Sequence, residues 1–367
     1  MQENKEGFFF PEINSAECIR CNLCDKVCPV IHEPDRSLQT LAYAVKNRNE
    51  GERQDSTSGG IFSLLAGNVI DRGGIVFGAA YGDDFVVRHI AVTSRTELPR
   101  LRSSKYVQSV IGKSLQDVET ALKSGRQVLF SGTPCQCSGL KAFLRKDYDN
   151  LLLVDLICHG VPSPKVWQTY IDYRASKENG GTRPVRINMR SKATGWGRYG
   201  YSIEFDYGED YITRIHNSQD LFMKAFIGNI CLRYSCSDCI AKGVERCTDF
   251  TLGDYWGVWD QHPEFDDNKG TSIVFVHSEK GHKILEQITD QIDYLKVDTD
   301  EAYKENMSLV KSSEAHEKRD EFLARINISN FKELVLEYFP SVEIKKAGFF
   351  QRIKGKVRSA LKRNNKE

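Results

Sequence analysis

The sequence lacks a long apolar run, and no hydrophobic stretch approaches the roughly 20 residues that a membrane-spanning helix needs. Its first residues, MQENKEGFFF, have no basic segment followed by an apolar stretch, so we expect no secretory signal. There is no GxGxxG or Walker A run. Neither charge dominates, since 51 Lys and Arg face 50 Asp and Glu. We therefore predict a cytoplasmic protein with no general attraction to nucleic acid.

The length of 367 residues leaves room for two or three domains, and 40% hydrophobic residues with 28% charged residues are typical of a globular protein. Eleven cysteines are present. In a long chain with no expected export signal, so many thiols indicate metal ligation or redox chemistry rather than a disulfide scaffold.

The first cysteine group reads C-x2-C-x2-C-x3-C-P and consists of Cys18, Cys21, Cys24, Cys28 and Pro29. This is the bacterial ferredoxin run for a [4Fe–4S] cluster, because short gaps let several thiolates converge on one cubane. A structural zinc knuckle is the alternative. In two-cluster ferredoxins the fourth cysteine ligates the other cluster, and this chain has one run only. We therefore expect half of a two-cluster module. The sequence does not determine which residue is the fourth ligand of its cluster.

Short, continuously apolar strands are predicted at 74–81, 127–130, 151–157 and 272–278. Helices are predicted through Leu41, Ala44 and Val45, over 61–70, and after the last three strands, at 140–144, 166–173 and 280–292. This pattern predicts an α/β fold: a mixed sheet with covering helices, preceded by a ferredoxin-like iron–sulfur segment. Sites in such sheets lie beyond the carboxyl ends of the strands, where Cys135 and Cys158 follow two of them.

A second cysteine group contains Cys231, Cys236, Cys239 and Cys247. Its spacing is compatible with a plant-type ferredoxin loop, with a four-cysteine zinc site, or with a Cys236–Cys239 pair completed by Cys135 and Cys158. The isolated Cys137 is predicted to be a small buried residue.

Eight segments occur together in this order: the ferredoxin run at 18–29, STSGGIF at 56–62, RSSKYVQS at 102–109, LFSGTPCQ at 129–136, DLICHGVPSP at 155–164, INMRSKATGW at 187–196, LRYSCSDC at 232–239 and TLGDYWGV at 251–258. From residue 7 to about residue 300, the chain resembles the coenzyme F420 hydrogenase/dehydrogenase beta-subunit family. The resemblance implies an oxidoreductase that passes electrons between [4Fe–4S] clusters, FAD and a second substrate. It also implies Cys135, Cys158, Cys236 and Cys239 as ligands of a second cluster, beside the run at Cys18, Cys21, Cys24 and Cys28.

Several residues fit a flavin dinucleotide. Ser58, Gly59 and Gly60 precede a predicted helix whose N–H groups can bind a pyrophosphate. Gly132 and Thr133 form a turn that can meet a phosphate or the flavin edge. Lys105, with Tyr106 and Gln108 beside it, can stabilise an anionic reduced flavin, and a solvated loop with surface ion pairs is the alternative. His159 is expected either to donate a proton to substrate or to hydrogen-bond a cluster sulfur.

Residues 345–367 carry nine basic residues and one acid, with apolar residues at helical spacing. This pattern is typical of an amphipathic helix at an anionic membrane surface, and a disordered tail or a docking helix is the alternative. The expected domains are 1–34, 38–118, 119–340 and the tail at 341–367. Expected partners are an electron donor or acceptor such as ferredoxin and a small-molecule substrate, either F420 or a sugar or glycan intermediate. The competing functions are a non-enzymatic electron-transfer subunit and a zinc-stapled structural protein.

Overall fold

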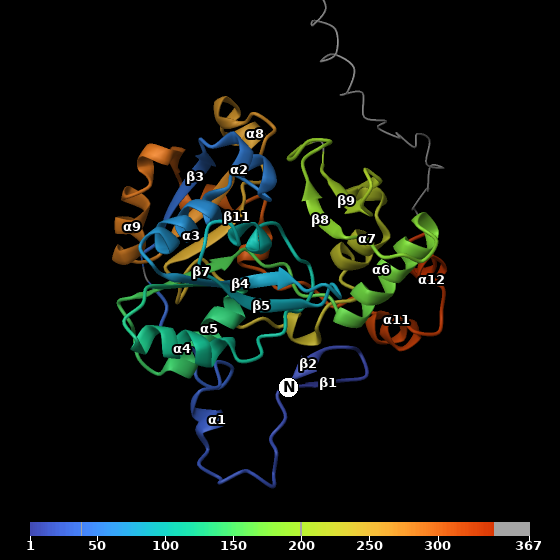
Figure 1. The fold of residues 1–367 in the computed structure, drawn as a ribbon, viewed down its shortest axis with the longest axis horizontal. Coiled ribbons are helices and arrows are strands. Elements are labelled where there is room, and N and C mark those ends of the chain that lie inside the picture. Colours follow the sequence, from blue (N-terminus) through green and yellow to red (C-terminus); the bar gives the residue numbers. More distant parts are fainter. Residues whose placement is uncertain (38, 199, 341–367) are drawn as a thin grey trace, which may run out of the picture.

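The computed structural model describes residues 1–37, 39–198 and 200–340, and its central feature is an eight-stranded mixed sheet (Figure 1). The strands lie in the order β13-β3-β12-β11-β7-β6-β4-β5. Their bounds are β3 Leu41–Asn47, β4 Ile75–Tyr81, β5 Val87–Val92, β6 Val128–Ser131, β7 Leu151–Leu156, β11 Phe250–Asp254, β12 Ser272–Val276 and β13 Ile292–Val297.

The middle of the sheet is parallel and its two edges are antiparallel. Strands β4, β6, β7 and β11 pair in parallel, whereas β5, β12, β3 and β13 join by antiparallel ladders. The carboxyl ends of β6, β7 and β11 therefore meet at one edge. The predicted mixed sheet with covering helices is confirmed.

Helices cover both faces of the sheet (Figure 1). On one face, α3 (Ile61–Asp71) and α9 (Glu279–Glu286) pack on alternate strand residues such as Leu152 and Val154. On the other face, α4 (Ser114–Lys123) and α5 (Pro134–Leu144) pack on Leu151 and Leu153. Strand β7 is thus apolar on both sides, which explains its continuous LLLV run.

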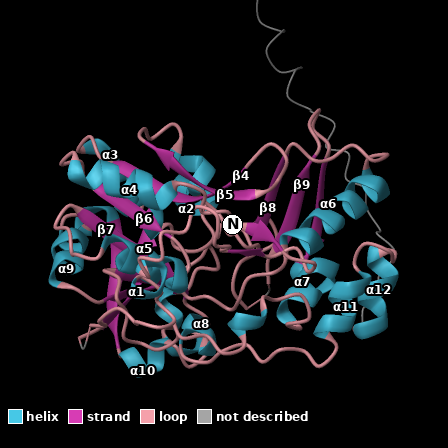
Figure 2. Ribbon diagram, turned by 90° about the horizontal axis from the view of Figure 1, so that it is seen from below, coloured by secondary structure: helices cyan, strands magenta, loops and turns pink. Residues whose placement is uncertain are grey.

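A second lobe contains the antiparallel sheet β10-β9-β8, with β8 Arg186–Ser191, β9 Ser202–Asp206 and β10 Ile212–His216 (Figure 2). Four helices pack beside it: α6 Pro164–Glu178, α7 Leu221–Ile227, α11 Arg319–Arg325 and α12 Phe331–Tyr338. Their core is aromatic, with Trp167, Tyr170 and Phe222 fully buried and in mutual ring contact.

The N-terminal hairpin of β1 (Gln2–Glu3) and β2 (Phe9–Phe10) is fastened to this lobe. Phe8 is fully buried in its core, and the Glu6 carboxylate accepts two hydrogen bonds from the Arg319 guanidinium, at 2.6 and 3.0 Å. The cysteine run follows on a segment that extends away from both lobes and contains the short α1 (Leu23–Lys26) (Figure 1). The remaining helices are α2 Glu50–Asp55, α8 Val258–Gln261 and α10 Thr299–Ala302.

Most predicted elements are confirmed, and one is wrong. The strands at 74–81, 127–130, 151–157 and 272–278 correspond to β4, β6, β7 and β12, and the helices after them to α5, α6 and the shorter α9. The helix expected through Leu41, Ala44 and Val45 is the strand β3, which pairs on both sides. The domain ranges stay predictions, although one sheet takes strands from both 38–118 and 119–340.

The expected amphipathic tail at 341–367 lies outside the described residues. Within the described part of the chain, no helix combines the length and apolar character needed to cross a bilayer.

Candidate functional site

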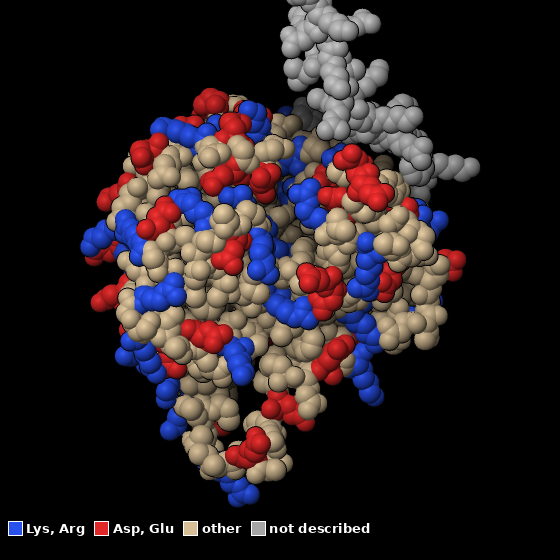
Figure 3. Space-filling view, in the orientation of Figure 1, with Lys and Arg blue, Asp and Glu red and all other residues tan. Residues whose placement is uncertain are grey.

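A cavity of about 420 Å³ lies between the two lobes, beyond the carboxyl ends of β6, β7 and β11. The larger lobe contributes the loop before α3, residues 101–107 and the strand ends. The smaller lobe contributes Arg190, Tyr201, Met223 and Phe226. The surface is hollowed along this junction, with Lys and Arg side chains around the hollow (Figure 3). The cavity therefore lies at the edge of the sheet where the sequence predicted a site.

The Ser58-Gly59-Gly60 loop lies on the cavity side of α3 and is held tightly to the sheet. Ser58 donates its hydroxyl to the carbonyl of Thr271 at 2.8 Å, and the Gly59 N–H donates to Ser272 Oγ at 2.9 Å. Gly60, at φ 85°, is the residue before the helix, and Ser58 and Gly60 line the cavity. The Gly59 N–H is thus already hydrogen-bonded to Ser272. The first turn of α3, with Ile61 and Phe62, lines the cavity.

We expect Gly59→Ala to destabilise the fold by about 1–3 kcal/mol, the usual cost of overpacking. A methyl group there would lie 2.2 Å from the Val45 carbonyl oxygen and 2.7 Å from the Ser272 nitrogen, both backbone atoms of neighbouring strands. Urea unfolding measures the change. Gly139→Ala is the matched control, because its methyl group, on α5, would meet no atom within 4 Å. Equal unfolding midpoints for the two variants would contradict this account.

Lys105 and Tyr106 line the cavity, but Gln108 does not. The Lys105 ammonium donates to the carbonyls of Arg102 at 2.6 Å and Ser103 at 3.2 Å, and burial lowers its pKa to about 7. The Tyr106 ring stacks on Phe226 at 4.8 Å between centroids. The Gln108 amide pairs with both backbone groups of Phe9, at 2.9 and 3.0 Å, so it fastens the N-terminal hairpin.

The turn at Gly132 and Thr133 also lines the cavity and begins α5. The side-chain oxygen of Gln136 accepts the Thr133 N–H at 2.9 Å, and its amide donates to Ser109 Oγ at 2.8 Å. Ser109 is 3.1 Å from His89 Nδ1, and His89 Nε2 is 3.1 Å from the Ser131 carbonyl. This network fixes the turn at the end of β6.

A buried ion pair between the lobes was not predicted. Arg190 Nη2 lies 2.9 Å from Asp254 Oδ2, and both residues line the cavity. The guanidinium carbon lies 3.8 Å from the centroid of the Tyr201 ring and 5.1 Å from that of Trp256, which gives cation–π contacts. The charged residues within the INMRSK and LGDYWG segments were the available signal, but the sequence did not show that they pair.

Cys135, Cys158, Cys236 and Cys239 are brought together from three segments. Cys135 lies at the start of α5, Cys158 follows β7, and Cys236 and Cys239 lie in the 232–239 segment. Burial raises the pKa of the Cys158 thiol, and negative charge on the other three cysteines raises it further. Burial likewise raises the pKa of Cys236, to about 11. All eleven cysteines are free thiols. Among residues 1–37, 39–198 and 200–340, no group of three or more Cys, His, Asp or Glu side chains is arranged around a single metal ion.

Two cations accompany these four cysteines. The Lys242 ammonium donates to the Cys158 carbonyl and to the Ser308 carbonyl at 2.6 Å. Arg233 interacts electrostatically with Cys236 and Cys135, and donates to the Phe9 carbonyl at 2.8 Å. A site for four thiolates thus has positive charge on two sides.

The other cysteines lie apart from these four. Cys18, Cys21 and Cys24 are exposed and Cys28 is half-buried; Cys24 lies in α1 and the others on the loop around it. Cys137 is fully buried in the α5 core, as predicted, and Cys231 is fully buried in the second lobe. Cys247 lies 3.4 Å from Ser138 Oγ.

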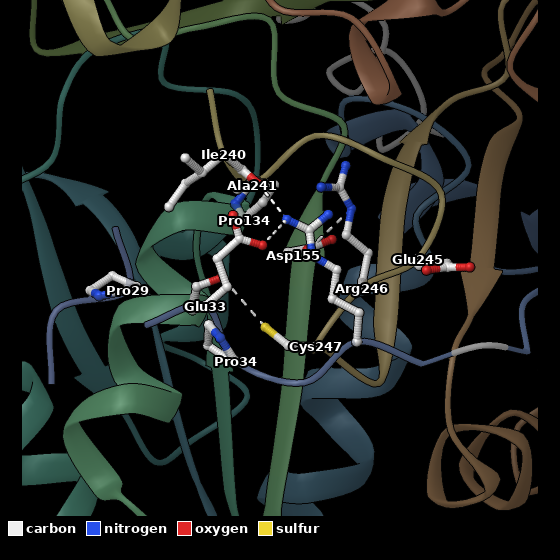
Figure 4. Close-up of a pocket in the computed structure, with 12 residues that line it drawn as sticks. Pro29, Glu33, Pro34, Pro134, Asp155, Ile240, Ala241, Glu245, Arg246 and Cys247 are labelled. Carbon is white, nitrogen blue, oxygen red and sulfur yellow. Dashed lines mark hydrogen bonds and ion pairs between the residues drawn. The ribbon is translucent and has the colours of Figure 1, made fainter. Parts of the chain in front are cut away.

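The segment after the ferredoxin run docks beside the four inner cysteines. A small cavity of about 20 Å³ is lined by Pro29, Pro134 and Ile240, the direct neighbours of Cys28, Cys135 and Cys239 (Figure 4). Arg36 fixes this segment, because its guanidinium donates to the Lys242 carbonyl at 2.7 Å and to Glu33 at 3.0 Å. The residue after Cys28 is thereby held close to the neighbours of Cys135 and Cys239.

His159 lines the large cavity, and its ring nitrogens face oxygen atoms rather than sulfur. Nε2 lies 2.7 Å from Asn229 Oδ1, and Nδ1 lies 3.3 Å from Ser313 Oγ. Because the Asn229 amide nitrogen donates to the Glu314 carbonyl, Oδ1 is an acceptor and the histidine hydrogen sits on Nε2. Burial lowers the pKa of His159, which favours the neutral ring.

Comparison with known proteins assigns the larger part of this site to a family. Residues 125–302 match the family model for the C-terminal part of the beta subunit of coenzyme F420 hydrogenase/dehydrogenase. This match confirms the predicted resemblance over residues 125–302.

Thirteen solved chains match the structure. One belongs to the F420-reducing [NiFe] hydrogenase complex from Methanosarcina barkeri, studied by xenon derivatisation; it is 17% identical, with 82% of this chain and 92% of that chain covered and a TM-score of 0.49. No curated protein matches the sequence.

Proposed function

We propose that the protein is an iron–sulfur flavoprotein subunit that passes electrons from an outer cluster, through an inner cluster, to FAD in the large cavity. The observation that carries this proposal is the position of the inner cysteines. They lie between the segment that follows the ferredoxin run and the cavity, and Cys158 itself lines the cavity. The end of the ferredoxin run, the inner cysteines and the cavity would then form a path for electrons.

The residues fit the inner cluster by their chemistry. Four free thiols, three of them half-buried and Cys135 exposed, lie near Lys242 and Arg233, and a cubane with four thiolates carries net negative charge that two such cations offset. Cys135, Cys158, Cys236 and Cys239 would hold it. An iron–sulfur cluster supplies one-electron transfer.

The large cavity fits a flavin dinucleotide. The first N–H groups of α3 have no partner within the helix and suit a pyrophosphate. Gly132 lines the cavity with its backbone. Lys105 adds a cation to the lining, and the Tyr106–Phe226 stack forms an apolar wall. A bound flavin supplies the exchange between one-electron and two-electron transfer.

The second candidate is an electron-transfer subunit that needs a separate catalytic chain, and the exposed ferredoxin run favours contact with a redox partner. F420 or a sugar or glycan intermediate as the final substrate stays a prediction from the resemblance. Peripheral membrane contact and a cytoplasmic location also stay predictions from the sequence.

Anaerobic purification with measurement of iron, sulfide, zinc and flavin per chain tests the proposal. We expect one FAD with about eight iron atoms if both clusters form, or about four if the inner cluster alone forms. Zinc without flavin would overturn the proposal and leave the structural alternative. Substrate-dependent bleaching of the flavin by the chain alone distinguishes an enzyme from an electron-transfer subunit.

A further inference from the structure

A continuous chain of side-chain hydrogen bonds crosses the sheet beside the inner cysteines. Asp155, at the end of β7, accepts a hydrogen bond from the Thr251 hydroxyl of β11. Thr251 Oγ1 lies 2.9 Å from His277 Nε2, and His277 Nδ1 lies 2.9 Å from Thr40 Oγ1. Asp155 and Thr251 are at most 1% exposed, and His277 is 3% exposed.

Asp155, at one end of this chain, and His277, next to its other end at Thr40, line different cavities. Asp155 lines both the large cavity and the small cavity beside Pro134 and Ile240 (Figure 4). His277 lines a third, outer cavity of about 340 Å³, together with Asp249 and Lys280. The chain of hydrogen bonds thus connects the outer cavity with the region of the inner cysteines.

The chain has two complete arrangements that differ by one proton. In the first, Thr40 donates to His277 Nδ1, His277 Nε2–H donates to Thr251, and Thr251 donates to the Asp155 carboxylate. In the second, Asp155 is protonated and every donor and acceptor is reversed. Each arrangement pairs the atoms that link these four side chains, so a proton can enter at the Thr40 end and a different proton can end on Asp155.

We propose that Thr40, His277, Thr251 and Asp155 form a proton relay that protonates Asp155 when the inner redox site gains an electron. One electron arrives from the reduced donor and one proton arrives from water in the outer cavity, so the net charge of the buried region is unchanged. On oxidation, the proton leaves by the reverse route. This proposal rests on the proposed function, because the electron must reach the inner site.

The surroundings of Asp155 suit this role. Burial raises its pKa to about 6, and the Arg246 guanidinium, 3.8 Å away, opposes that rise. Asp155 Oδ2 and Arg246 Nε have no hydrogen-bond partner in the described chain. Cys137 and Cys247 also face Asp155, and Arg246 and His282 face His277. Burial lowers the pKa of His277 to about 3, so this ring passes protons without storing one.

The first test is the reduction potential of the inner cluster, followed by electron paramagnetic resonance from pH 5 to pH 9 in the anaerobic holoprotein. In the wild type we expect a constant potential below about pH 6, where Asp155 is already protonated. Above it, the potential falls by up to about 59 mV for each tenfold drop in proton concentration. Asp155→Asn should remove this slope. An unchanged slope in that variant would overturn the proposal.

The second test separates the relay from the acceptor. Thr251→Val keeps Asp155 and Arg246 but breaks the hydrogen-bond chain, so the equilibrium slope should remain. Proton uptake after rapid reduction, measured with an indicator dye, should slow at least tenfold. Thr271→Val is the matched control, because this fully buried hydroxyl has no partner within the described residues. Equal uptake rates in the two variants would overturn the relay.

A third measurement does not need a cluster. The infrared carbonyl band of a protonated carboxyl group should appear below about pH 6 in the wild type and be missing in Asp155→Asn. Its absence from the wild type overturns this proposal, whereas its presence in protein without redox centres would show that only the proposed function has failed.

Discussion

Replacement of Cys158 by alanine should remove about four iron atoms and four sulfides per chain, because a [4Fe–4S] cluster with one thiolate missing loses its protein support. Cys158 follows β7 directly and lies among Cys135, Cys236 and Cys239. Iron and sulfide analysis after anaerobic purification, with the visible spectrum, measures the loss. Cys158 also lines the large cavity proposed to bind FAD, so we expect reduced flavin content in the same variant.

Cys231→Ala is the matched control, since this thiol is equally free but fully buried in the aromatic core of the second lobe. It should keep its iron and flavin and lose only stability. Cys21→Ala removes a thiol of the exposed outer run, so any iron that it loses belongs to the first cluster. Equal iron contents in the Cys158 and Cys231 variants would contradict the inner cluster, and loss of zinc in place of iron would favour the structural alternative.

The sequence predicted the parallel centre of the fold because its strands are buried on both faces. The runs at 127–130 and 151–157 are mostly apolar, and turn residues with a helical segment after such a run favour a buried parallel strand. The segment LAYAV at 41–45 satisfied a short helical pattern equally well. Its strand conformation depends on pairing with β12 and β13, which lie more than 200 residues away. Periodicity over five residues cannot contain that information.

Site residues that lie in a local turn could be predicted from the sequence. Site residues that depend on contacts between distant parts of the chain could not. Gly132 and Thr133 reach the cavity because they directly follow β6, and Lys105 lies on a loop that lines it. Gln108 is only a few residues from Lys105 but points to Phe9, which no local pattern indicates. The Arg190–Asp254 pair and the Asp155–Thr251–His277 chain each join separate strands, so only the assembled sheet reveals them.

Replacement of Lys105 by methionine should weaken FAD binding by about 10- to 100-fold at pH 6. A hydrogen bond to a charged group contributes about 1.5–3 kcal/mol, and each 1.4 kcal/mol corresponds to a tenfold change in affinity. Methionine keeps most of the side-chain volume, so the fold should tolerate the change. Flavin fluorescence in titrations of flavin-depleted protein measures the affinity.

The dependence on pH identifies the charge of Lys105 as the cause. Burial lowers the pKa of this ammonium to about 7, so the flavin-free protein loses the positive charge as the pH rises above that value. An anionic ligand raises the pKa again, and binding above pH 7 must therefore take up a proton. Wild-type affinity should fall between pH 7 and pH 9, whereas the methionine variant should show no such fall.

Lys192→Met provides the control for this pH dependence. Burial lowers the pKa of Lys192 to about 7 as well, but its ammonium donates to the backbone carbonyls of Arg53 and Ser58, and the residue does not line the cavity. The fall in affinity above pH 7 should persist in this variant. If it disappears there and persists in Lys105→Met, then Lys192, and not Lys105, carries the charge that the flavin requires.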